Sequence, residues 1–357
     1  RGYYNSQEIG LGRALARKGH EVMIYKGIDP SEKEEKVQVE KNLTIWYLPM
    51  KHLGAHGFMD CKNLDPQLKA LFCFGDQQIF LPHVYRWCRR RRIPFVAYVG
   101  TAHSLDSNFK SKVMNALFAA GTLRIYKKNP VLAKTSAAKE ELRQLGVPHA
   151  VIAPVGLDNA VLKKNIPADE KMRLRKEHGF EADDVILCNV SRLSWEKRPL
   201  ELIDLFLQVK GKKKFKLIIV GNGPLEEELN EKIRKNGLEK EVKIYPNVPY
   251  EKMWEIYEMS DYYLNMNKGE IFGMAIMEAV YYKTSVAAIR ALGPSVTLKD
   301  MKGHKLCEND DEMAEWITGP YPSEKDLQES SEKMAATFTW DRCADAFLQA
   351  SSEKSSR

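Results

Sequence analysis

The sequence contains no run of about 20 apolar residues, the length that a helix needs to cross a bilayer, and no signal peptide is visible. It also lacks any C-x-x-C pair. The six cysteines are scattered along the chain: Cys61, Cys73, Cys88, Cys188, Cys307 and Cys343. We predict that all six are reduced thiols, mostly in the core, which is typical of a cytoplasmic protein.

No Asp-x-Asp sequence occurs, so a metal-chelating carboxylate pair of that kind is missing, and we predict no metal site and no cofactor. Tandem repeats are also missing, and the only biased tract is a polar tail at 351–357, which we predict to be frayed. With 357 residues the chain is long for one core, so two domains are expected.

Positive charge is concentrated towards the start of the chain. Residues 1–150 hold 24 Lys and Arg against 13 Asp and Glu, a net charge of +11, whereas the remainder carries −4. The basic residues include an arginine run at 89–92 and the pair Lys127 and Lys128. Such a surface favours an anionic partner, such as a membrane surface, a lipid phosphate or a polyanion. A solvated basic face without a partner is the alternative, and no nucleic acid partner is predicted.

Short β-rich runs alternate with helical segments along the whole chain, which is the pattern of parallel βα units. The predicted strands of the first half lie at 21–27, 43–50, 68–74, 94–100, 130–136 and 150–156. Those of the second half lie at 185–191, 215–221, 241–246, 261–267 and 284–290. A polar stretch at 157–184 separates the two series and marks the predicted domain junction. The sequence therefore predicts two open α/β domains that face each other across a cleft, with ligands at the carboxyl ends of the strands.

Two loops at such strand ends carry candidate phosphate-binding residues. The loop at 191–199 contains Arg192 and Lys197, which could both reach one diphosphate, because Arg offers a planar fork and Lys a mobile point charge. The loop after the next strand contains Gly221 and Gly223, which permit a tight turn.

A third loop leads into the segment "EIFGMAIMEA" at 270–279. Gly273 permits close backbone approach, and the helix that it opens presents free amides with a partial positive charge, which is a site for a diphosphate. Glu270 precedes this helix and Glu278 lies within it, so each carboxylate could hold the hydroxyls of a sugar. In the first half, His103 follows an apolar strand and is the histidine best placed for catalysis. Taken singly, each of these residues also fits a surface or structural role.

In this order and at these spacings, the motifs resemble those of glycosyltransferase family four, retaining enzymes of the GT-B fold, over most of the chain. "SRLSWEKRP" is similar to the family's G-R-L-x-x-x-K-G segment, "VGNGPLEEEL" to G-x-G-P-x-x-x-x-L, and "EIFGMAIMEA" to the E-x7-E block. "GHEV" at 19–22 and "APVGLD" at 153–158 match further family landmarks.

The resemblance implies a GT-B architecture with two facing Rossmann-like domains, parallel sheets and an interdomain cleft. The acceptor-binding domain would span 1–157, with its first strand missing from this chain. The nucleotide-sugar donor domain would span 158–335. A C-terminal helix at 336–357 would pack back towards the first domain before the frayed tail.

The resemblance also implies roles for particular residues. The implied donor-binding residues are Gly2, Arg192, Lys197, Gly221, Gly223, Glu270, Ile271, Phe272, Gly273, Met274 and Glu278. Arg192 and Lys197 would bind the diphosphate, and Glu278 would hold the nucleotide ribose. Glu270 would contact the donor sugar, and His103 would lie near the transferred sugar, so these two would be the catalytic residues.

The sequence departs from the family pattern at three places. Lys283 stands where a glycine is usual, and "ALGP" at 291–294 replaces the common Gly-Gly. Gly75 and Asp76 lie in a region that does not align. These departures leave the acceptor and the identity of the sugar open.

The resemblance implies transfer of a sugar from a nucleotide diphosphate, with UDP-sugars favoured, to a hydroxyl of a carbohydrate or lipid-linked acceptor, with retention at the anomeric carbon. The expected setting is surface polysaccharide or glycolipid synthesis in the cytoplasm, with contact to the inner face of the cell membrane. A sugar-nucleotide epimerase or hydrolase of the same fold, and a non-catalytic sugar-nucleotide-binding scaffold, are the alternatives. Gly10 and Gly12 also suggest a dinucleotide-binding dehydrogenase, but Leu15 occupies a position that needs a small residue, and the motif lies inside a helical pattern.

Overall fold

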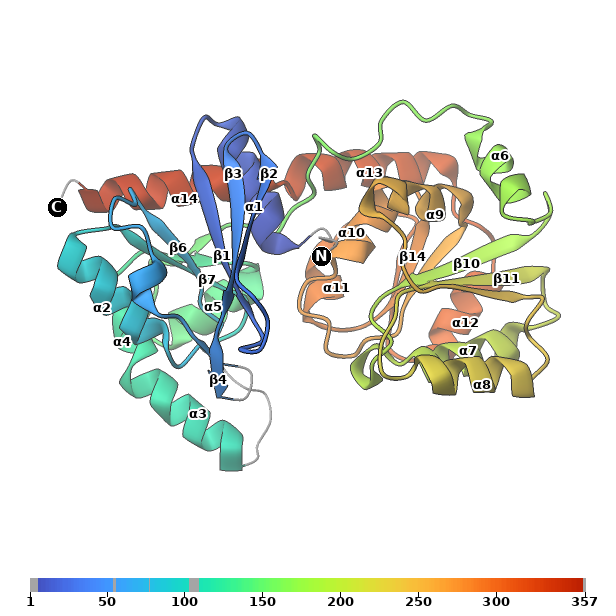
Figure 1. The fold of residues 1–357 in the computed structure, drawn as a ribbon. Coiled ribbons are helices and arrows are strands. Elements are labelled where there is room, and N and C mark those ends of the chain that lie inside the picture. Colours follow the sequence, from blue (N-terminus) through green and yellow to red (C-terminus); the bar gives the residue numbers. More distant parts are fainter. Residues whose placement is uncertain (1–5, 54–55, 77, 103–108, 356–357) are drawn as a thin grey trace. The chain divides into compact units, whose positions relative to one another are not determined.

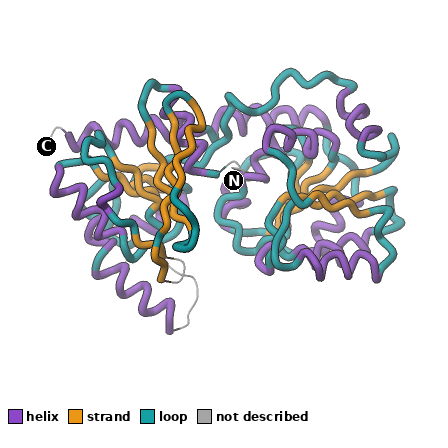
Figure 2. Tube along the Cα trace, viewed as in Figure 1, coloured by secondary structure: helices purple, strands orange, loops and turns teal. Residues whose placement is uncertain are grey.

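The computed structural model describes residues 6–53, 56–76, 78–102 and 109–355. The chain divides into two compact units, each with its own sheets and core (Figures 1 and 2). Residues 6–156 and 339–355 form the N-terminal unit, and residues 157–338 form the C-terminal unit. Every predicted run contains a strand, and the predicted α/β class with parallel sheets in two Rossmann-like domains is confirmed.

The N-terminal unit contains two main sheets. In the first, β1 (Val22–Ile28) pairs in parallel with β3 (Leu43–Pro49), and β3 pairs in antiparallel fashion with β2 (Glu35–Glu40). The second sheet is parallel, in the order β6 (Leu71–Phe74), β7 (Phe95–Val99), β8 (Val131–Ala133) and β9 (Val151–Ile152). A hairpin of β4 (Lys51–Leu53) and β5 (His56–Phe58) follows the first sheet. The antiparallel strands β2, β4 and β5 were not predicted, since β2 is rich in charge and the other two are only three residues long.

The helices in the described part of this unit are α1 (Gln7–Arg17), α2 (Leu81–Arg91), α3 (Phe109–Ala120), α4 (Thr122–Tyr126), α5 (Ser136–Gln144) and α14 (Trp340–Ser355), with a 3-10 turn η1 (Cys61–Asn63). Helix α1 is followed by a glycine in the left-handed region, Gly19 with φ +86°. Helix α14 continues through Ser355.

Helix α1 packs closely against α14 and the first sheet because it contains two glycines. A Cβ added to Gly10 would lie 2.0 Å from Nε1 of the buried Trp340, and one added to Gly12 would lie 2.8 Å from Leu43. Both glycines lie inside α1, after no described strand. They are therefore packing positions rather than a dinucleotide fingerprint.

Strands β1 and β6 lie at the edges of their respective sheets. Both line one groove of about 1290 Å³, together with apolar side chains of α1 and α14 such as Leu11 and Phe347. Among the described residues, β1 pairs with β3 and β6 pairs with β7, so each has one unpaired edge. The strand that the resemblance places before Gly2 is outside the described residues.

The C-terminal unit has a single parallel sheet of six strands in the order β12-β11-β10-β13-β14-β15. Its strands are β10 (Val185–Val190), β11 (Phe215–Val220), β12 (Val242–Tyr245), β13 (Tyr262–Asn265), β14 (Ser285–Ile289) and β15 (Lys305–Cys307). The chain builds outwards from β10 to β12 and then returns to add β13 on the other side of β10. In an open parallel sheet, ligands bind where the strand order reverses in this way, here at the carboxyl ends of β10 and β13.

Helices lie on both faces of this sheet (Figure 1). One face carries α7 (Pro199–Val209), α8 (Glu226–Lys235) and α12 (Asp310–Thr318), and the other carries α9 (Met253–Met259), α10 (Met274–Tyr281) and α13 (Glu324–Thr337). The remaining short elements are α6 (Glu170–Glu177), α11 (Leu292–Thr297), η2 (Trp195–Lys197) and η3 (Tyr250–Lys252). In α7, Leu202, Phe206 and Val209 recur at helical spacing and are buried in the core against the sheet.

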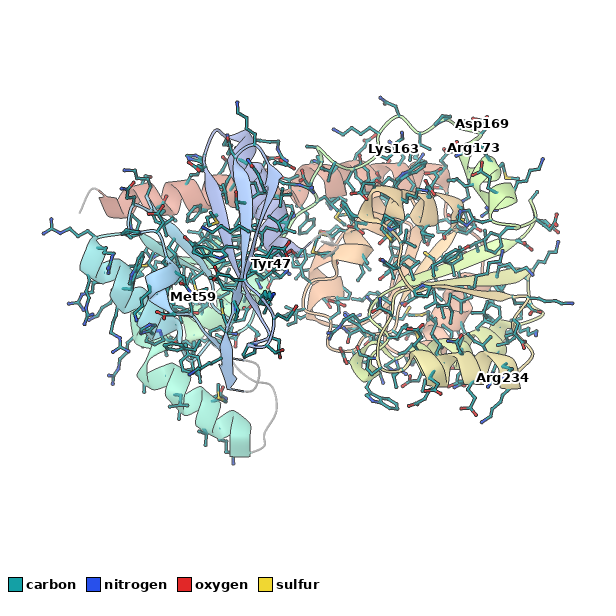
Figure 3. The ribbon with its side chains drawn as sticks, in the orientation of Figure 1. Tyr47, Met59, Lys163, Asp169, Arg173 and Arg234 are labelled. Atoms are coloured by element: carbon teal, nitrogen blue, oxygen red, sulfur yellow. The ribbon has the colours of Figure 1, made fainter. Side chains whose placement is uncertain are left out.

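The polar stretch predicted as the junction contains helix α6, which belongs to the C-terminal unit. Arg173 points outwards in Figure 3, whereas Arg175 is buried and its Nη2 lies 2.6 Å from Oδ2 of Asp261. Asp261 directly precedes β13, so this ion pair attaches α6 to the sheet. The division between the units lies at the start of the polar stretch, after Gly156.

The cysteines follow the sequence prediction. All six are free thiols, and all except the half-buried Cys73 are buried. Burial raises the pKa of the Cys188 thiol to about 12, which makes it unreactive at neutral pH.

His304 makes the stability of the C-terminal unit depend on pH. Its Nδ1 accepts a hydrogen bond from the Val286 amide at 3.0 Å, and burial of the ring lowers its pKa to about 4. Between pH 6.5 and 4 the unfolded chain takes up a proton that the folded chain does not, so the free energy of unfolding should fall by at most about 3 kcal/mol as the pH drops. His304→Asn keeps an acceptor and cannot be protonated, and should flatten this region of the profile in urea unfolding. His178→Asn is the control, and an unchanged slope in His304→Asn would contradict the assignment.

Lys283, one of the departures from the family pattern, has a left-handed backbone with φ +59° after the end of α10. This conformation costs a non-glycine residue about 1–2 kcal/mol. Replacing the lysine by glycine removes that cost, but the greater conformational entropy of the unfolded chain offsets part of the stabilisation. We expect Lys283→Gly to stabilise the unit by about 0.5–1 kcal/mol, a rise in Tm of about 1–4 °C. Lys283→Ala keeps the strain and should leave the Tm unchanged in a thermal melt. Equal behaviour of the two variants would argue against backbone strain.

Candidate functional site

The loops that follow β10 and β11 are locked together. The amide of Leu193 donates to the carbonyl of Asn222 at 2.9 Å, and the amide of Leu225 donates to the carbonyl of Leu193 at 3.0 Å. Gly221 has φ +140° and a Cβ there would lie 1.9 Å from the Ser191 carbonyl oxygen. The predicted tight turn is therefore present, and its glycine is required by contact with the neighbouring loop.

Gly223 has the same role two residues later in the chain. Its φ is +157°, and a Cβ at this position would lie 2.5 Å from the carbonyl oxygen of Leu193. The two glycines thus hold the backbone of the loop at 191–198, from which Arg192 and Lys197 project.

Lys197 reaches the segment that follows β13. Its Nζ lies 2.8 Å from Oε2 of Glu270, and the two side chains are 24% and 15% exposed. The side-chain amide of Asn267 donates to the same Oε2 at 3.1 Å. The structure therefore brings together two of the predicted site residues, 73 positions apart in sequence, at the carboxyl edge of the sheet.

The charge of Glu270 is set by opposing effects. Burial raises the pKa of its carboxyl, but the charge of Lys197 and the hydrogen bonds from Lys197 and Asn267 outweigh burial, and the pKa lies below its ordinary value. Glu270 is therefore ionised at neutral pH. It can accept hydrogen bonds from hydroxyl groups, but it has no proton to donate as an acid.

Arg192 is arranged differently. Its side chain is 78% exposed and pairs with Glu196 of its own loop at 3.3 Å. Glu196 also accepts a hydrogen bond from Oγ of Ser194 at 2.6 Å. In the structure Lys197 contacts Glu270, whereas Arg192 contacts Glu196. Because exposed ion pairs contribute little, Arg192 can exchange Glu196 for another anion at low cost.

The N-terminus of α10 lies directly after Glu270. Gly273 is its N-cap residue with φ +82°, Phe272 before it is buried, Ile271 is 44% exposed, and Met274 is half-buried. The amide of Gly293, from the "ALGP" segment, donates to the carbonyl of Glu270 at 2.8 Å. The departure at 291–294 therefore supplies a backbone contact that holds this turn.

Glu278 is buried, with 7% of its surface exposed, and its Oε2 accepts a hydrogen bond from the Tyr257 hydroxyl at 2.8 Å. Burial raises the pKa of Tyr257 well above its ordinary value, and the neighbouring carboxylate adds to this effect. The interpretation of the two glutamates as surface residues is therefore wrong, because both are largely removed from water.

Two residues of the third loop were missed in the sequence. Oδ1 of Asn265 accepts from the amide of Asn267 at 3.0 Å, and Oδ1 of Asn267 accepts from the amide of Gly269 at 2.9 Å. These successive asparagine turns shape the path from β13 to Glu270. The N-x-N-x-G spacing at 265–269 was the available signal.

Arg198 was also missed, and it ties the first loop to the third. Its guanidinium makes two bonds to Asp310, at 3.1 and 2.8 Å, and donates to the carbonyl of Met266 at 3.3 Å. Arg198 itself has a left-handed backbone with φ +55° at the start of α7. Asp310 lies 112 residues away, so no local pattern could have indicated the pair.

Two predicted residues cannot be placed, because His103 and Gly2 lie outside the described residues. Within the described ranges, no group of three or more His, Cys, Asp or Glu side chains could hold a metal ion.

Comparison with known proteins finds similarity to glycosyltransferases. Residues 170–333 match the family described as Glycosyl transferases group 1. The D-inositol 3-phosphate glycosyltransferase of Xylanimonas cellulosilytica is 23% identical, covering 100% of this chain and 93% of the relative. The alpha-monoglucosyldiacylglycerol synthase of Acholeplasma laidlawii is 21% identical, covering 76% of this chain and 73% of the relative.

Solved structures share the fold. Sucrose-phosphate synthase from Thermosynechococcus elongatus superposes with a TM-score of 0.72 at 15% identity, over 97% of this chain and 92% of that one. HepE of Anabaena, in complex with UDP and glucose, gives a TM-score of 0.64 at 18% identity, over 80% of this chain and 78% of that one. The chain therefore has the GT-B fold, and its residues 170–333 match the family described as Glycosyl transferases group 1.

Proposed function

We propose that this protein is a retaining glycosyltransferase that moves a sugar from a nucleotide diphosphate to a hydroxyl acceptor without a metal ion. The group 1 domain and the glycosyltransferase relatives support the transfer reaction. The observation that carries the proposal is the contact of Lys197 with Glu270 beside the N-terminus of α10. A cation, helix amides and an ionised carboxylate at one place provide contacts for phosphate oxygens and for sugar hydroxyls.

In the proposed reaction, the acceptor oxygen attacks the anomeric carbon from the face that the diphosphate leaves. The bond between the anomeric carbon and the phosphate oxygen breaks, the new glycosidic bond forms, and the acceptor proton passes to the departing phosphate oxygen. Lys197 and the amides at Gly273 stabilise the negative charge on the leaving group. Arg192 exchanges its ion pair with Glu196 for a contact with the same diphosphate. Glu270 holds the sugar hydroxyls, and Glu278 holds the nucleotide ribose. His103, on the acceptor side, is proposed to lie near the transferred sugar.

UDP-sugars are the proposed donors, which the shared fold of HepE, solved with UDP and glucose, supports. Thermal melts of the protein with UDP, GDP, UDP-glucose and GDP-mannose test this, because a ligand that binds only the folded state raises its apparent stability. We expect a rise with UDP and UDP-glucose and none with the guanosine compounds. A shift with the guanosine compounds alone would overturn the choice of base.

The alternatives of epimerase and hydrolase differ from transfer in what happens without an acceptor. Incubation with UDP-glucose alone should leave most of the donor intact if the protein is a transferase. Stoichiometric conversion to another sugar nucleotide would identify an epimerase, and rapid release of free glucose would identify a hydrolase.

The proposed acceptor is a carbohydrate or a lipid-linked molecule, with the basic N-terminal unit in contact with an anionic bilayer. None of the helices in the described ranges is long and apolar enough to cross a membrane. The last turn of α2 carries the exposed Arg89, Arg90 and Arg91, which complement the charge of anionic lipids. Co-sedimentation with phosphatidylserine vesicles should occur at low salt and weaken as salt rises. Binding that is indifferent to salt, or absent, would refute the contact.

A further inference from the structure

In the N-terminal unit, three neighbouring parallel strands are each followed by residues that meet at one edge. Asp76 follows β6, the backbone of residues 100–102 follows β7, and Lys134 follows β8. None of these residues belongs to the proposed donor site, and Asp76 lies in the region that did not align with the family pattern.

Asp76 and Lys134 form an ion pair across the end of β7. Nζ of Lys134 lies 2.7 Å from Oδ2 of Asp76, and the side chains of Lys134 and Asp76 are 7% and 35% exposed. The lysine ammonium lies 5.2 Å from the centre of the Tyr98 ring and 5.6 Å from that of Phe74. The cation is therefore enclosed by rings of β6 and β7 and by the carboxylate of Asp76.

The other oxygen of Asp76 binds backbone. Its Oδ1 accepts hydrogen bonds from the amides of Gly100 and Thr101. Oε2 of Glu141, on α5, accepts from the next amide, that of Ala102, at 3.0 Å. Three successive amides at the end of β7 are thus held by two carboxylates from different elements.

The fit of this cluster is tight. A Cβ at Gly100 would lie 2.9 Å from Cδ of Lys134 and 3.3 Å from Oδ1 of Asp76. The residue before Asp76 is fixed too, because the Tyr126 hydroxyl donates to the carbonyl of Gly75 at 2.7 Å. Removing a charged pair from water costs about as much as the pair returns, so stability alone does not account for this arrangement. What the pair does determine is the path of the backbone at 100–102.

We propose that Asp76, Lys134 and Glu141 are positioning residues that fix the backbone at 100–102 for the acceptor side of sugar transfer. The inference rests on the proposed function, in which the N-terminal unit receives the acceptor. Ligands of open parallel sheets bind at the carboxyl ends of the strands, which is where these residues lie. Asp76 and Lys134 act through the backbone and through each other.

Two double variants separate backbone capping from charge. Asp76→Leu with Lys134→Met removes both the charges and the acceptor for the amides, without leaving a buried charge unpaired. Asp76→Asn with Lys134→Met removes the same charges but keeps an oxygen for the amides of Gly100 and Thr101. At Ala102 the same comparison is made with Glu141→Leu, which removes the acceptor for the amide, and Glu141→Gln, which keeps it. These two variants replace the double variants if Asp76→Leu with Lys134→Met does not fold.

The assays use UDP-glucose as donor, with inositol 3-phosphate or diacylglycerol vesicles as acceptor probes. For the Leu/Met variant, kcat/KM for the acceptor should fall about 10- to 100-fold, the size expected for a misplaced reacting group. The KM for the donor and the slow hydrolysis of UDP-glucose should stay within about twofold of wild type, because no donor contact changes. The Asn/Met variant should recover most of the acceptor activity. Equal activity of the two double variants, or parallel losses in transfer and donor hydrolysis, would overturn the proposal.

Hydrogen exchange tests whether these residues hold the backbone at 100–102 independently of the proposed function. The amides at 100–102 should exchange faster in the Leu/Met variant than in the Asn/Met variant and wild type. If wild-type protein transfers no sugar to any acceptor, the proposed function fails and the acceptor role fails with it. If the Leu/Met variant shows unchanged exchange rates at 100–102 and transfers sugar as wild type does, the positioning role is refuted and the proposed function is not.

Discussion

Lys197→Met is expected to lower the kcat of sugar transfer by about 100- to 1000-fold, the usual loss when a charge that stabilises the leaving group is removed. Lys197 carries a fixed positive charge 2.8 Å from Glu270 and beside the N-terminus of α10. The methionine keeps the length and apolar stem of the side chain. The stability should also fall, by about 3 kcal/mol, because Glu270, with 15% of its side chain exposed, loses its charged partner.

Steady-state kinetics with UDP-glucose, alongside a thermal melt, measure this effect. Lys210→Met is the matched control, since Lys210 pairs with Glu241 at 3.5 Å, and both residues precede strands at the amino edge of the same sheet. That variant should transfer sugar at the wild-type rate. Near-normal turnover by Lys197→Met would remove the main support for the proposed leaving-group site.

Gly293→Ala is expected to lower kcat/KM by about 100-fold and to destabilise the C-terminal unit by about 1–3 kcal/mol. The added Cβ would lie 2.5 Å from the amide nitrogen of Phe272 and 2.6 Å from its Cα. Both atoms are backbone, so no side chain can rotate away to make room. The turn that carries Glu270 and Gly273 must shift.

Gly269→Ala provides the matched control within the same loop. A Cβ at Gly269 would meet its nearest neighbour, Oδ1 of Asn267, at 3.6 Å, which is an ordinary contact. Kinetics and urea unfolding should therefore give wild-type values for this variant. If Gly293→Ala also behaves as wild type, the "ALGP" segment does not position the turn.

The fold could be predicted from the sequence because buried parallel strands appear there as continuous apolar runs. Continuous apolar runs separated by helical segments identified most strands of the parallel ladders, and the strand-to-helix loops indicated where polar residues would meet. Strand β15 was missed because only Lys305–Cys307 are extended, and β2 was missed because its exposed edge is charged. Short or edge strands bury too little surface to leave an apolar run.

The candidate site could be predicted only as far as its loops. That Lys197 and the segment after β13 share one sheet edge follows from the parallel topology, but the direct contact with Glu270 depends on how both loops turn. Arg192 lies in the same loop and yet pairs with Glu196, four residues further along the chain, instead of with Glu270. The bonds of Arg198 and Lys134 span 112 and 58 residues, and single-sequence periodicity carries no information over such separations.

The edges of β1 and β6 that are unpaired among the described residues bear on how this polypeptide behaves in concentrated solution. Rows of free amide and carbonyl groups on apolar strands recruit strands from other molecules. We therefore expect association through these edges to increase with concentration, and a ligand that occupies the groove lined by both strands should reduce it.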